Sequence, residues 1–81
     1  MSDGAEELLL KHEINRQAAM QKAKTAADRI SLMTTQVSHH ATFVALDLDE
    51  LARYVATLRA TQAMVIEASA KIRQYMKEAV G

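Results

Sequence analysis

The sequence contains no cysteine and no proline, and its 81 residues include only two glycines and three aromatic side chains. Without cysteine the chain can form no disulfide, and it offers no thiolate for catalysis or for metal binding, which suits a reducing compartment. Gly4 and Gly81 lie at the two ends, so neither glycine nor proline interrupts the residues between them. These absences favour long helices that no covalent cross-link supports.

Net charge and long apolar runs are also missing. Ten basic and ten acidic residues cancel, so the total charge does not indicate long-range attraction to nucleic acid or to anionic lipid. The longest apolar runs, such as Leu8–Leu10 and Phe43–Leu46, are far shorter than the roughly 18 residues that span a bilayer. The acidic start, with Asp3 and Glu6, lacks the basic and apolar parts of a signal peptide. We therefore expect a cytoplasmic protein that does not bind membranes.

The clearest local signal is the start of a helix near the middle of the chain. Asp47 has a side chain that accepts a hydrogen bond from a free N–H of a first helical turn, and Glu50 follows three residues later, as in a capping box. Leu46 and Leu51 stand at the two positions of a hydrophobic staple. Three start signals therefore coincide at one place.

Residue preferences divide the rest of the chain into two helices. Helix formers thin out between residues 34 and 44, where threonine, serine, histidine and valine are frequent. We predict a single all-α domain over residues 1–81. Its first helix covers about residues 4–37, its turn about 38–46, and its second helix about 48–80.

Apolar residues recur with the spacing of a coiled coil. From Ala19 the steps along the first helix alternate between four and three residues, and the second helix carries a wider apolar face. The residues expected to form the core or an oligomer interface are Ala23, Ile30, Met33, Val37, Leu48, Leu51, Val55, Leu58, Val65 and Ile72.

Two helices of equal length around one turn favour an antiparallel helical hairpin. Because the turn is centred near residue 42, facing residues should have numbers that add to about 84. The acidic start of the first helix then lies beside the basic end of the second. Two helices alone bury too little, so we expect a homodimer in which two hairpins form a four-helix bundle.

One competing architecture uses the same periodicity. Apolar residues seven apart run without interruption through the predicted turn, from Ala23 to Ile72. A single helical rod of about 110 Å in a coiled coil of several chains would use this register.

Few residues are candidates for chemistry. His39 and His40 are adjacent, whereas helical metal sites favour histidines four residues apart, so a solvated turn is the simpler interpretation. Helix capping already accounts for Asp47 and Glu50, which leaves Asp49 without acidic partners for catalysis. We therefore expect no enzyme activity, no cofactor and no metal site.

The predicted function is a small protein–protein interaction module: an adaptor, a regulator, a chaperone-like protein or an assembly subunit that acts through helix faces. The expected partner-binding patch lies off the main periodicity and consists of Leu8, Leu9, Leu10 and Ile14. One alternative is a dimeric nucleic-acid-binding regulator whose basic contacts would be Lys11, Lys22 and Arg29. Another is a structural subunit of a filament, a secretion system or a phage particle.

Overall fold

The computed structural model describes residues 2–80, with side chains described for residues 4–78. Two long helices, α1 (Ser2–Thr35) and α3 (Leu48–Val80), make up most of this part of the chain. A short 3₁₀ helix, η1 (Gln36–Ser38), and a single helical turn, α2 (His40–Val44), connect them. The described residues contain no strand, so the prediction of an all-α protein with two long helices is confirmed.

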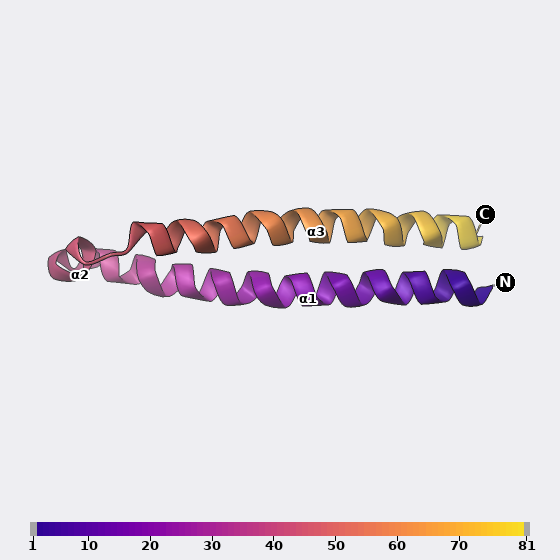
Figure 1. Cartoon of the computed structure of the whole chain (residues 1–81), viewed down its shortest axis with the longest axis horizontal. Helices are drawn as coiled ribbons and strands as arrows, with labels where there is room; N and C mark the ends of the chain where they lie inside the picture. The colour runs from indigo at the N-terminus through magenta and orange to yellow at the C-terminus, as the bar shows by residue number, and fades with distance from the viewer. Residues whose placement is uncertain (1, 81) are drawn as a thin grey trace.

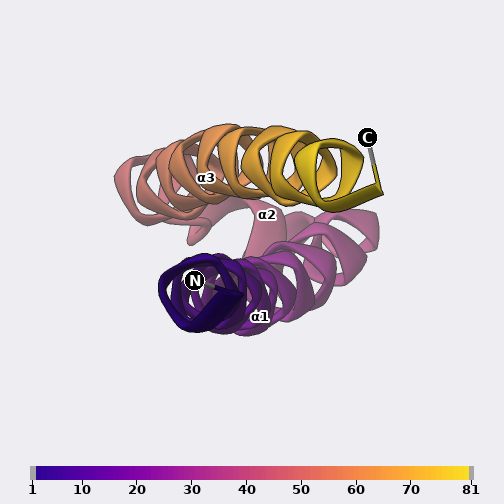
Figure 2. The same ribbon diagram turned by 90° about the vertical axis from the view of Figure 1, so that its right-hand side faces the viewer.

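The two long helices lie side by side and run in opposite directions, so the start of α1 and the end of α3 lie at the same end of the molecule (Figure 1). Seen end-on, they cross at an angle rather than lying parallel (Figure 2). The molecule measures 62 × 16 × 16 Å, far shorter than the single rod of about 110 Å that the continuous periodicity allowed.

An aromatic pair fixes how the two helices align. The rings of His12 and Tyr75 stack with their centroids 5.8 Å apart, so facing residues have numbers that add to 87 rather than about 84. Seven residues nearly complete two helical turns. Successive steps of seven from this pair therefore match Ala19 with Ala68, and Ala26 with Thr61.

The most buried residues are small. Ala19, Ala26, Thr61 and Ala68 are all buried, and Ile72 is the only large side chain among residues 4–78 that joins them. The Thr61 hydroxyl donates to the carbonyl oxygens of Thr57 (2.8 Å) and Leu58 (3.1 Å) in its own helix. A polar residue therefore sits at the closest approach of the two helices without leaving a hydrogen-bonding atom unpaired.

The buried side of α3 differs from its most apolar side. Tyr54, Thr61, Ala68 and Tyr75, which are seven residues apart, face α1 and are buried or half-buried. The apolar row expected from the sequence also includes a neighbouring set of larger residues that stay exposed: Leu48, Val55 and Met76. The small residues let the helices approach closely, so α3 turns part of its apolar face away from α1.

Hydroxyl side chains mark the end of α1. Thr34 and Thr35 both donate to the carbonyl oxygen of Ser31, and Ser38 donates to that of Thr35 (3.1 Å). Hydroxyl groups that bond back to a carbonyl oxygen three or four residues earlier compete with regular helix geometry. His39 then adopts an extended conformation (φ −112°, ψ 126°), which ends η1 before α2 begins. The helix thus ends at Thr35, and the turn contains two short helical segments.

The start of α3 matches the sequence signal. The carboxylate of Asp47 accepts a hydrogen bond from the backbone N–H of Glu50 at 3.0 Å, so the predicted cap is confirmed. The Glu50 carboxylate accepts a hydrogen bond from the Tyr54 hydroxyl at 3.0 Å, instead of reaching back to Asp47 as a capping box would require. The cap is therefore one-sided, and Glu50 fastens the first turn of α3 to its second.

Replacing Asp47 with alanine should lower the free energy of unfolding by about 0.5–2 kcal/mol, because it removes the side-chain acceptor at the start of α3. Urea denaturation followed by far-UV circular dichroism, at one fixed protein concentration, measures this change. Asp47→Asn keeps an acceptor oxygen and should lose less. Equal stability of the alanine variant and the parent would contradict this role of the cap.

Candidate protein-interaction face

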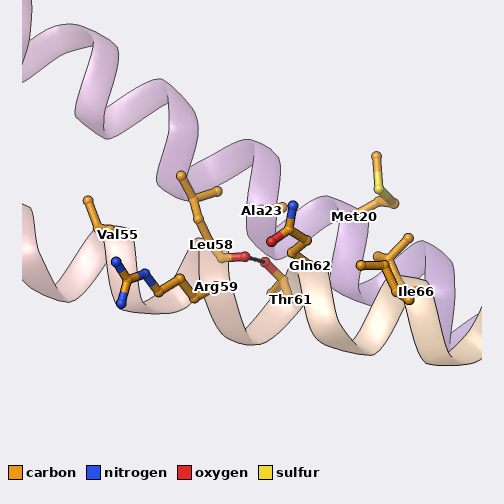
Figure 3. Close-up of a pocket in the computed structure, with 9 residues that line it drawn as sticks. Met20, Ala23, Val55, Leu58, Arg59, Thr61, Gln62 and Ile66 are labelled. Carbon is orange, nitrogen blue, oxygen red and sulfur yellow. Dashed lines mark hydrogen bonds between the residues drawn. The ribbon is translucent and has the colours of Figure 1, made fainter.

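One side of the helix pair carries an apolar groove. It has a volume of about 460 Å³ and lies between α1 and α3 (Figure 3). Its lining residues come from both helices: Met20 and Ala23 from α1, and Val55, Leu58, Arg59, Thr61, Gln62, Val65 and Ile66 from α3. Apart from Arg59, Thr61 and Gln62, these side chains are hydrophobic, so the groove offers mostly apolar surface.

A second hollow continues the groove toward the turn. It has a volume of about 430 Å³ and shares Val55 and Arg59 with the first. Leu48 and Leu51 line it, and Leu48 is 65% exposed. We call these two hollows together the open face, lined by Met20, Ala23, Leu48, Leu51, Ala52, Val55, Ala56, Leu58, Arg59, Thr61, Gln62, Val65 and Ile66.

Helix periodicity explains why the open face forms. On α3 the apolar residues occupy two neighbouring rows, one containing Leu58 and Val65 and the other containing Leu48 and Val55. The first row lies half-buried beside α1, while the second points outward. On α1, Ala23 is half-buried and Met20 is exposed in the same way. Each helix therefore contributes a covered row and an uncovered row to the same side of the molecule.

The opposite side of the pair carries both polar and apolar residues. A hollow of about 360 Å³ there is lined by Lys22, Thr25 and Tyr54, among others, and shares no residue with the groove on the open face. The hydroxyls of Thr25 and Thr57 on this side donate to carbonyl oxygens of their own helices. Large exposed apolar residues also lie outside the open face, among them Leu10, Ile14, Leu32 and Met64.

The residues predicted for the core or an oligomer interface occupy three environments. Ile72 is buried. Six others are half-buried: Ala23, Ile30, Met33, Leu51, Leu58 and Val65. Val37, Leu48 and Val55 are exposed in the single chain. Sequence reasoning did not include Met20, Gln62 or Ile66, although Gln62 lies seven residues after Val55 and thus shares its side of the helix.

The predicted patch of Leu8, Leu9, Leu10 and Ile14 does not form one surface. Consecutive helical residues point about 100° apart, so the three leucines project in different directions from α1. Leu9 is half-buried, whereas Leu10 and Ile14 are more than half exposed and, four residues apart, share one side. Only these last two could act together.

The polar candidates remain accessible. Lys11, Lys22 and Arg29 are all exposed on α1, and Lys22 lies on the side opposite the open face. Nucleic-acid binding through them stays a prediction. His39 precedes α2 and His40 begins it, and both are exposed. Within residues 4–78, no three histidine, aspartate or glutamate side chains gather closely enough to hold a metal ion.

Comparison with protein-family models, with curated proteins and with solved structures finds no match to this chain. Among the helices that the structure describes, none has an apolar stretch long enough to cross a membrane.

Proposed function

We propose that this chain is a small, non-enzymatic protein–protein interaction module. In this proposal it is a helical hairpin that pairs with a second copy through the open face and forms a four-helix bundle. The observation that carries the proposal is the contrast between a core of small residues and the large apolar side chains left uncovered along the open face. The exposed ones on the open face are Met20, Leu48, Val55 and Ile66.

The size of the surface supports this proposal. A side of the molecule 62 Å long and 16 Å wide is large enough to hold a stable protein interface, which typically takes about 800 Å² per partner. Chains of this size are marginally stable when they bury little. A second copy would complete the core because it brings the same apolar rows to the same face.

Light scattering on a sizing column, at several concentrations, measures the mass directly. We expect about twice the 9.0 kDa of one chain. Val55→Glu places a charge in the middle of the open face and should shift the mass to that of one chain, because an unpaired carboxylate is costly to bury.

A matched control lies on the other side of the molecule. Leu32 is more exposed than Val55 and shares its side of α1 with Thr25, away from the open face. Leu32→Glu should therefore leave the mass unchanged. A parent protein that stays monomeric at every concentration would refute self-association. A Val55→Glu variant that still dimerises would show that the interface lies elsewhere on the molecule.

A further inference from the structure

The uncovered row of α3 has an unusual arrangement. Five residues spaced by seven form it: Leu48, Val55, Gln62, Ser69 and Met76, of which Ser69 is half-buried and the other four are exposed. Gln62, which carries the only amide among them, is the middle residue of the five. It is exposed, and Figure 3 shows it between Leu58 and Ile66 in the groove. Gln62 and Ser69 are the two polar residues of this row, and a polar residue in an apolar helical row can fix how partner helices align.

We infer that α3 of one copy packs antiparallel against α3 of a second copy, about a twofold axis that passes beside Gln62. This inference rests on the dimer proposed above and specifies its alignment. Under this symmetry Leu48 faces Met76 of the second copy, Val55 faces its Ser69, and Gln62 faces its own counterpart. The half-buried row of α3 that contains Leu58 and Val65 is related by the same twofold axis, because Leu58 then lies opposite Val65 of the second copy.

The chemistry of glutamine suits a position on the axis. Its side-chain amide carries both donors and an acceptor, so two symmetric copies can bond to each other reciprocally. A shift by one heptad would place each Gln62 against Val55 or Ser69 of the second copy. Such a shift would cost the reciprocal bond, and beside Val55 the amide would face a side chain that cannot hydrogen-bond.

The charges beside the row are compatible with the antiparallel direction. Ala52, Arg59, Ile66 and Arg73 are spaced by seven along its outer edge. In an antiparallel pair, the same edges of two helices meet in reverse order. Arg59 then lies beside Ile66 of the second copy, and Arg73 beside its Ala52. In a parallel pair the same edges would lie on opposite sides of the interface, so the arginines would instead face the half-buried row that contains Leu58 and Val65.

The first helix offers a compatible surface at the same height. Because Ala26 is level with Thr61, Gln62 is level with Thr25, midway between Ala23 and Ala27. These alanines lie toward the open face, on the same side as Met20. Their small side chains let the α1 helices of two copies approach where the α3 helices meet at Gln62. Gln62 on α3 and the two alanines on α1 therefore lie at the same height along the molecule.

Cysteine cross-linking tests the alignment directly, because the natural chain has no cysteine. Three single variants are needed: Gln62→Cys, Val55→Cys and Ser69→Cys. On mild oxidation, Gln62→Cys should form a disulfide-linked dimer, because residues on the axis meet their own counterparts. Val55→Cys alone should remain unlinked. An equal mixture of Val55→Cys and Ser69→Cys should form the mixed dimer, which mass spectrometry identifies.

Light scattering of each variant under reducing conditions separates the possible failures. If the variants are dimers but Val55→Cys links to itself, the helices are parallel and the inference is wrong. If neither Gln62→Cys nor the mixture links, the alignment is wrong although the proposed dimer stands. If the parent protein is a monomer, or its mass reflects a larger assembly, both the alignment and the proposed dimer fail.

Discussion

Replacing Ile72 with alanine is expected to lower the free energy of unfolding by about 2–5 kcal/mol. Ile72 is 6% exposed and is the only large side chain in the buried set, whose other members are alanines and a threonine. Its removal takes away apolar contact area and leaves a cavity that the two rigid helices cannot close. Urea denaturation at a fixed protein concentration measures the change.

Leu32→Ala is the matched control for Ile72→Ala. It also truncates a branched aliphatic side chain within a long helix, but Leu32 is 55% exposed. Alanine is the best helix former, so its helix propensity does not penalise either variant. The control should change stability by less than about 0.5 kcal/mol. Similar losses at both positions would mean that Ile72 is not part of the core.

The second large effect is expected at the closest approach of the helices. Ala19 is 1% exposed and is level with buried Ala68 across the pair. Leucine at position 19 adds three carbon atoms where the structure has no room for them. Overpacking of this kind typically costs about 1–3 kcal/mol, because the backbones or the neighbouring side chains must move. Thermal and urea unfolding should both show the loss.

Ala18→Leu separates crowding from any general effect of the substitution. Ala18 precedes Ala19 in α1 but is exposed. The same atoms are therefore added to the same helix, without an opposing surface to meet them. Its stability should stay within about 0.5 kcal/mol of the parent. If Ala19→Leu is equally well tolerated, the helices do not approach as closely as the burial of the alanines indicates.

Local signals in the sequence predicted the secondary structure well. The all-α character follows from the helix-forming residues and from the lack of proline and internal glycine. The start of α3 follows from Asp47, whose carboxylate caps the helix as expected. Capping depends on atoms only a few residues apart, so it can be derived without knowing what the helix packs against. The turn was less predictable, because the Thr42 hydroxyl bonds to the carbonyl oxygens of Gln36 and His39, which only the folded turn brings within its reach.

Packing between the helices was harder to predict. The sequence pattern selects large apolar residues, and on α3 these include Leu48 and Val55. The structure instead buries Thr61 and Ala68, because small side chains occupy the place where two backbones come closest. The size of an apolar side chain indicates how much free energy its burial contributes. It does not indicate which row of a helix faces the neighbouring helix. The open face follows from this difference, since the larger residues were left outside.

The alignment of His12 with Tyr75 also bears on how the helices come together. The same register places Met33 level with Tyr54, and these residues are only 21 positions apart, whereas His12 and Tyr75 are 63 positions apart. Closing the shorter loop costs about 1 kcal/mol less chain entropy. Helix pairing that begins beside the turn therefore brings the next pair of facing residues close together at little further cost in chain entropy. The two helices can then pair progressively from the turn toward their free ends.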